Sequence, residues 1–198
     1  MDAVTPMTRT IERRELVRRL LLDRGDLVVV SGLGSATWDV AAAGDDPLNV
    51  YLWGAMGGTV MIGLGLALAR PDRRVAVITG DGDALMGVGS LATVGVQAPH
   101  NLAIVVLDNR HYGETGMQPS HTQAGIDLVA IAEACRFRLA RTLSRIEEAD
   151  DVRALLHDGE GPIFISARIE ADDTERVLPL RDGHAIKQRF IASLQSRA

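Results

Sequence analysis

Short apolar runs alternate along the chain with segments in which apolar residues recur at the spacing of a helix. Runs of this length, rich in β-branched residues, are typical of strands buried on both faces. The predicted strands are Leu27–Val30, Leu48–Trp53, Val75–Thr79, Leu102–Leu107, Phe137–Ala140 and Ile163–Ala167. The predicted helices are Ile11–Asp23, Thr59–Ala69, a segment from Gly82 through Gly95, Asp127–Cys135, Ile146–Leu156 and Ala185–Leu194. This alternation predicts an α/β fold, a three-layer domain around a doubly wound, mostly parallel sheet.

Local signals mark several ends of these elements. Thr8 or Thr10 is placed to cap the first helix, and Pro71 ends the helix that begins at Thr59. That helix contains Gly63 and Gly65, which lower helix propensity. We expect the two glycines to allow close packing on the sheet or on a neighbouring subunit.

Composition narrows the classes of protein that fit. The chain has 198 residues, a formal net charge of −5 and one cysteine. We expect a single domain over residues 1–198, with a loose tail at residues 1–7. An acidic chain is a poor partner for nucleic acid, and one cysteine excludes a disulfide within the chain. The sequence has no uncharged stretch long enough to predict a membrane segment, so we expect a cytoplasmic protein.

Polar residues follow two of the strands that are joined through one helix. Gly80-Asp81-Gly82 ends the strand Val75–Thr79, and Asp108-Asn109 ends Leu102–Leu107. A right-handed crossover places both ends on one edge of the sheet, where ligands bind in such folds. The helix start attracts phosphate, and carboxylate and amide oxygens suit Mg²⁺. The sequence therefore predicts a Mg²⁺-diphosphate site, with a plain glycine turn and a capping Asp as the alternative.

This arrangement resembles the diphosphate-binding motif of thiamine diphosphate enzymes. The resemblance implies that Asp81, Asn109 and the main-chain carbonyl of His111 hold Mg²⁺, and that Gly80 and the amides of Gly82 and Asp83 contact the diphosphate. Two departures concern Asp108, where the family has Asn, and Asp83, where a small residue is usual.

Two further segments fit the same resemblance. Gly54-Ala55-Met56-Gly57 looks like the segment that binds the aminopyrimidine ring of the cofactor. The resemblance places Met56 under the cofactor and has the Gly54 carbonyl accept a hydrogen bond from the amino group of that ring. The turn after Leu27–Val30 resembles a second phosphate contact, made by Ser31, Gly32 and Ser35. The alternatives are core filling for Met56 and an ordinary turn for the serines.

A polar loop over residues 110–122 follows Asn109. Loops at this edge carry substrate contacts, and His111 and His121 are its candidate acid–base groups, with solvated histidines as the alternative. Its sequence resembles the β subunits of sulfopyruvate and phosphonopyruvate decarboxylases, which places Tyr112 and Gly113 among the cofactor contacts.

The resemblance implies a thiamine diphosphate-dependent 2-oxo acid decarboxylase subunit. The glutamate that activates the cofactor would come from a separate pyrimidine-binding α subunit, in an α₂β₂ or higher assembly. Three alternatives stay open: a carboligase of the acetolactate synthase type, the β subunit of an oxo acid:ferredoxin oxidoreductase, and a regulatory nucleotide-binding domain.

Overall fold

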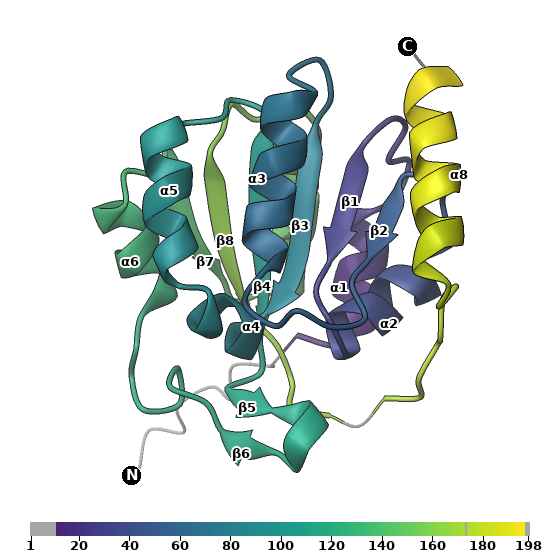
Figure 1. Ribbon diagram of the computed structural model, residues 1–198. Helices are drawn as coiled ribbons and strands as arrows, with labels where there is room; N and C mark the ends of the chain where they lie inside the picture. The colour runs from purple at the N-terminus through teal and green to yellow at the C-terminus, as the bar shows by residue number, and fades with distance from the viewer. Residues whose placement is uncertain (1–10, 173, 197–198) are drawn as a thin grey trace, which may run out of the picture.

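The protein is built on one six-stranded sheet in which every paired strand is parallel (Figure 1). The computed structural model describes residues 11–172 and 174–196. The strand order is β2-β1-β3-β4-β8-β7. The bounds are β1 Val28–Ser31, β2 Asn49–Tyr51, β3 Val75–Gly80, β4 Leu102–Asp108, β7 Leu139–Leu143 and β8 Ile163–Arg168.

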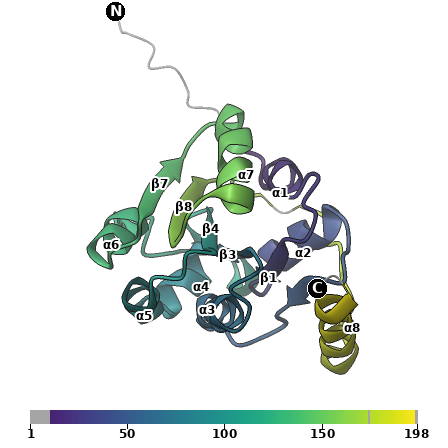
Figure 2. The same cartoon turned by 90° about the horizontal axis from the view of Figure 1, so that it is seen from above.

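Helices cover both faces of the sheet (Figure 2). One face carries α1 (Arg13–Leu20), α2 (Ser35–Ala42) and α7 (Ala149–Asp158). The other carries α3 (Thr59–Ala69), α4 (Asp81–Met86), α5 (Gly89–Gln97) and α6 (Leu128–Ala134). Helix α8 (Gly183–Ser196) lies beside β2 at one edge. The predicted three-layer, doubly wound fold is confirmed.

Alternate strand residues supply two separate apolar cores. In β1, Val29 faces the α1–α2–α7 layer, whereas Val28 and Val30 face the layer that contains α3. All three side chains are at most 1% exposed, as expected for strands covered on both faces. This burial explains why the strands could be recognised as continuous apolar runs.

The structure corrects several predicted boundaries. Helix α2 was not predicted, and the helix expected from Gly82 through Gly95 is two helices that meet at Gly87. A side chain at Gly87 would overlap the carbonyl of Gly57, so this turn is shaped by contact with a distant loop. Strand β7 begins at Leu139 and not at Phe137, because the Phe137 amide donates to the carbonyl of Ala132 in α6 at 3.1 Å. The Phe137 ring packs against Phe164 in the core, with ring centroids 5.7 Å apart. The segment Ile146–Glu148 is a 3₁₀ turn before α7.

The first helix begins later than predicted. Glu12 caps α1 by accepting hydrogen bonds from the amides of Arg14 and Glu15, at 2.8 Å and 2.6 Å. The predicted caps Thr8 and Thr10 and the predicted tail at residues 1–7 lie outside the described residues.

The two glycines of α3 differ in what surrounds them. A β-carbon on Gly63 would overlap a methyl group of Val77 in β3, so this glycine lets the helix lie close to the sheet. A β-carbon on Gly65 meets no atom within 4 Å. Packing on the sheet thus explains Gly63, whereas the expected subunit contact for Gly65 stays a prediction.

Two connections pass the carboxyl edge of the sheet. A small hairpin, β5 (His111–Tyr112) and β6 (Gln118–Pro119), encloses the 3₁₀ turn Gly113–Thr115 and lies below the sheet in Figure 1. The C-terminal crossover segment, residues 169–172 and 174–182, joins β8 to α8. It packs on both tryptophans: Arg176 lies 4.7 Å from the Trp38 ring centroid, and the Leu180 carbonyl accepts from the Trp53 indole at 3.1 Å.

A search of the described part of the chain finds no helix with the length and apolar character that a membrane span requires.

Candidate functional site

A cavity of about 610 Å³ opens at the carboxyl edge of the sheet, next to the ends of β1 and β3. Strand β1 is followed by β2 on one side and neighbours β3 on the other, so the chain changes direction across the sheet at this point. Such a switch point is where open α/β sheets bind ligands. Topology alone therefore makes this cavity the candidate site.

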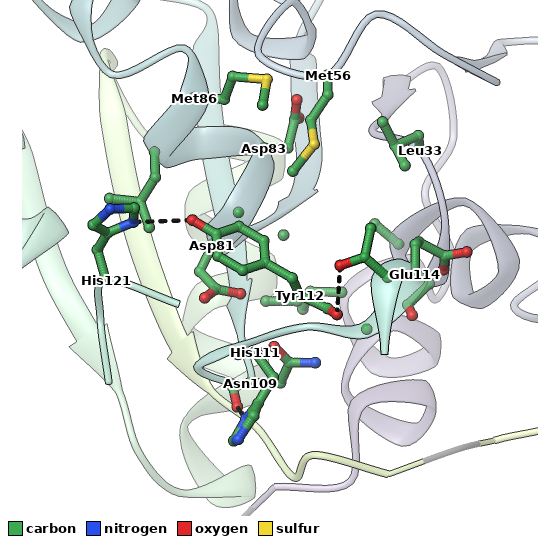
Figure 3. Close-up of a pocket in the computed structure, with 18 of the residues that line it drawn as sticks. Leu33, Met56, Asp81, Asp83, Met86, Asn109, His111, Tyr112, Glu114 and His121 are labelled. Carbon is green, nitrogen blue, oxygen red and sulfur yellow. Dashed lines mark hydrogen bonds between the residues drawn. The ribbon is translucent and has the colours of Figure 1, made fainter. Parts of the chain in front are cut away.

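Most of the predicted site residues line this one cavity. They are Ser35, Met56, Gly80, Asp81, Gly82, Asp83, Asn109, His111, Tyr112, Gly113 and His121. The two strand-end groups on which the prediction depends, Asp81 and Asn109, both face it (Figure 3). Ser31, Gly32 and Gly54 are not among its lining residues. The Ser31 hydroxyl is buried and lies 2.7 Å from the Thr37 hydroxyl in α2.

Asp81 is the first residue of α4 and is 2% exposed. Its Oδ2 accepts hydrogen bonds from the hydroxyls of Ser120 and Thr122. Burial raises the pKa of Asp81, and the nearby charge of Asp108 adds to this shift, while the two hydroxyls oppose it. The cavity thus contains a buried carboxylate whose charge is only partly compensated by the protein.

The turn after β4 is held by its own polar groups. Asn109 Oδ1 accepts from the amide of His111 at 2.9 Å, and the imidazole Nδ1 of His111 lies 2.8 Å from the Asn109 carbonyl oxygen. An amide oxygen has a second lone pair, so this turn leaves Asn109 able to accept or coordinate once more. The His111 ring is turned back on its own backbone.

Asp83, which departs from the family pattern, holds two loops together. Its carboxylate accepts from the Thr79 hydroxyl at the end of β3 and from the amide of Gly57. Both oxygens are therefore engaged with the protein, and the residue is 6% exposed. This bond fixes the position of the segment that carries Met56.

Tyr112 and Met56 both lie over Gly82. A β-carbon on Gly82 would stand 2.7 Å from Cε1 of Tyr112 and 3.1 Å from Cε of Met56, so only glycine fits at this helix start. The Tyr112 hydroxyl lies 2.9 Å from Nδ1 of His121, and Figure 3 marks this contact with a dashed line. His121 thus belongs to the cavity wall through Tyr112.

Several polar groups around the site were not among the predicted residues, and four of them matter for its electrostatics. Ser120 and Thr122 bind Asp81 from residues 39 and 41 positions away in the chain. Arg168, at the end of β8, pairs with Asp108 at 2.8 Å, and Arg13 lines the cavity from α1. The signal for the first two was present, because Ser and Thr flank the candidate His121 in the loop.

In residues 11–172 and 174–196, no group of three or more His, Cys, Asp or Glu side chains is arranged to hold a metal ion. The predicted metal site is of a different kind, with one carboxylate, one amide and one carbonyl oxygen.

A cavity at the switch point, with a buried carboxylate and a helix start beneath it, is the arrangement with which α/β domains bind phosphorylated cofactors. Residues 33–167 match the family "Thiamine pyrophosphate enzyme, C-terminal TPP binding domain", and the chain belongs to this family. Thiamine pyrophosphate is another name for thiamine diphosphate.

Within this family, the chain is most usefully compared with decarboxylases of known name. The chain is 37% identical over 188 residues to sulfopyruvate decarboxylase subunit beta of Methanothermobacter thermautotrophicus, covering 93% of this chain and 96% of that one. It is 39% identical over 144 residues to phosphonopyruvate decarboxylase of Streptomyces viridochromogenes, covering 73% of this chain and 36% of that one. Among solved structures, benzoylformate decarboxylase of Polynucleobacter necessarius shares the fold, with a TM-score of 0.70, 16% identity, and 89% and 36% of the two chains covered.

Proposed function

We propose that this chain is the Mg²⁺- and thiamine diphosphate-binding β subunit of a 2-oxo acid decarboxylase whose substrate resembles sulfopyruvate or phosphonopyruvate. The observation that carries this proposal is the shared cavity of Asp81, Asn109, Gly82 and Met56. The near full-length similarity to a protein named as a decarboxylase β subunit supports the same reaction.

The residues present fit the cofactor's diphosphate and a magnesium ion. Asp81, Asn109 and the carbonyl of His111 offer the hard oxygen ligands that Mg²⁺ prefers. The amides of Gly82 and Asp83 lie in the first turn of α4, and the absence of a side chain at Gly82 lets a ligand approach the backbone. Met56 offers an apolar support beside them. When bound, thiamine diphosphate supplies an electron sink for the loss of carbon dioxide.

The net reaction also constrains the cavity. A 2-oxo acid anion takes up one proton and gives an aldehyde and carbon dioxide, so the site needs a proton donor. His111 and His121 stay the candidates for this role. The His111 ring contacts its own turn, whereas the His121 ring contacts Tyr112 and is solvent-exposed.

A partner subunit completes this proposal. Relatives named as β subunits imply an α subunit, and we assign to it the glutamate that activates the cofactor. Helix α3 leaves an uncharged outer surface that includes Met61 and Leu68, which are 42% and 49% exposed. Exposed apolar surface of this kind supports assembly with other chains, in the α₂β₂ or higher form that we propose.

The test is reconstitution. We expect the purified chain alone to release no carbon dioxide from sulfopyruvate or phosphonopyruvate, and the complex with a pyrimidine-binding subunit to do so in the presence of Mg²⁺ and thiamine diphosphate. Product analysis with pyruvate and an acceptor distinguishes a carboligase, and calorimetry with ADP and NAD distinguishes a regulatory nucleotide-binding domain. Full activity of the isolated chain would contradict the proposal.

Cofactor binding should depend on pH through Asp81. Its pKa is raised by burial, and only the ionised carboxylate coordinates a metal, so affinity should rise as pH increases through that raised pKa. Calorimetry with Mg²⁺ and thiamine diphosphate, from the pH range where an ordinary aspartate titrates up to neutral pH, measures this.

Thiamine diphosphate itself titrates in the same way with every variant, so a difference between two variants reports on the protein alone. The comparison variant is Asp108→Asn. Loss of the Asp108 charge lowers the pKa of Asp81 and should move the profile to lower pH. Identical profiles for the two proteins would show that Asp81 does not set the dependence.

A further inference from the structure

A chain of buried polar groups links the predicted metal ligand to the neighbouring strand. Ser120 and Thr122 bind Oδ2 of Asp81, and their hydroxyls lie 2.9 Å apart. The single hydroxyl proton of Thr122 is shared between the two carboxylates, because its Oγ1 lies 2.8 Å from Oδ1 of Asp108 and 3.2 Å from Oδ2 of Asp81. Asp81 and Asp108 are each 2% exposed. Two acidic side chains therefore share one buried network.

One cation meets this network among the described contacts. Arg168 is paired in register with Asp108 between the parallel strands β8 and β4, which places both side chains on the same face. Its Nη1 lies 2.8 Å from Oδ2 of Asp108. The other oxygen of Asp108 accepts from Thr122 and from the amide of Arg110 at 3.1 Å.

The position of Asp108 explains why this pair matters. Asp108 directly precedes Asn109, and its bond to the Arg110 amide shapes the turn that carries the predicted metal ligands. A buried carboxylate without a counter-charge is costly, and beside Asp81 it repels both that carboxylate and an incoming diphosphate. A neutral amide at this position would cause neither the burial cost nor the repulsion. A carboxylate avoids them only when a cation neutralises its charge.

We propose that Arg168 is a positioning residue of the cofactor site, which neutralises Asp108 so that this residue holds the Asn109 turn as a neutral amide would. Of the two carboxylates that share the Thr122 hydroxyl, Asp81 is then the one left without a counter-charge and facing the metal. This inference rests on the proposed thiamine diphosphate site, and it adds a residue from β8 that contacts neither cofactor nor metal.

The experiment is a rescue test on the full chain. We expect Arg168→Gln to weaken thiamine diphosphate binding about tenfold or more at saturating Mg²⁺ and to lower the unfolding midpoint of the cofactor-free chain. In Arg168→Gln/Asp108→Asn the counter-charge is no longer needed, so both values should return to within about threefold and a few degrees of wild type. Arg145→Gln, which removes an exposed ion pair with Glu148, is the matched control and should change neither.

The outcomes separate the possible explanations. An Arg168→Gln chain that binds like wild type, or a double variant no better than Arg168→Gln, overturns the proposal, because a merely structural arginine would not be rescued by Asp108→Asn. If wild type itself does not bind thiamine diphosphate, the proposed function fails. The unfolding measurements on the cofactor-free chain still decide whether Arg168 compensates the Asp108 charge.

Discussion

Replacing Asp81 with alanine is expected to abolish Mg²⁺-dependent binding of thiamine diphosphate, with a loss of affinity of about a hundredfold or more, or ~2.7 kcal/mol. The reason is that Asp81 is the charged ligand in the predicted set, with neutral oxygens from Asn109 and His111 beside it. Isothermal titration of the chain with the cofactor, with and without Mg²⁺, measures the loss.

The same substitution should leave the fold intact. Asp81 is buried with a raised pKa, so its removal relieves the cost of a desolvated charge. Unfolding of the cofactor-free variant should therefore occur at or above the wild-type midpoint. Asp150→Ala, on the exposed first turn of α7 across the sheet, is the matched control and should keep full affinity. Retained affinity in Asp81→Ala would exclude the proposed metal site.

The second large effect concerns Gly95 in α5. A β-carbon there would overlap the main-chain carbonyl of Cys135 at the end of α6, and neither backbone can move without shifting a helix. We expect Gly95→Ala to lower the free energy of unfolding by about 3 kcal/mol, the upper range for overpacking. Chemical denaturation monitored by circular dichroism measures it.

Gly65→Ala is the control for this prediction. Gly65 lies inside α3, where a β-carbon meets no atom within 4 Å, so alanine should raise stability by about 0.5–1 kcal/mol through helix propensity. Equal effects at Gly95 and Gly65 would show that the α5–α6 contact does not restrict residue size. A strong loss for Gly65→Ala in an assembled complex, absent from the isolated chain, would place α3 in a subunit contact.

Much of the fold could be predicted because its signals are local. The buried strands are continuous apolar runs, and both polar turns of the site begin directly where such a run ends, at Gly80 and at Asp108. Parallel pairing then brings Asp81 and Asn109 to one edge, so the shared cavity follows from spacing and handedness. Local patterns of this kind were enough to predict the fold class and most of the residues that line the cavity.

The features that were not predicted depend on contacts between distant segments. Helix α2 contains the fully buried Asp39, which pairs with Arg13 at 3.2 Å, so its pattern does not show a simple apolar face. The break at Gly87 depends on the approach of Gly57, and the hydroxyls of Ser120 and Thr122 reach Asp81 only after the loop has folded back. Arg168 reaches Asp108 through strand register, which a single sequence does not show.

The crossover segment over Trp38 and Trp53 has a practical consequence. These are the two tryptophans of the chain, and each carries an arginine of that segment, Arg176 at 4.7 Å and Arg181 at 5.2 Å from the ring centroid. Trp53 also directly precedes the turn with Gly54 and Met56. Tryptophan fluorescence therefore reports on the contacts of the crossover segment, so any change that displaces this segment can be followed without an added label.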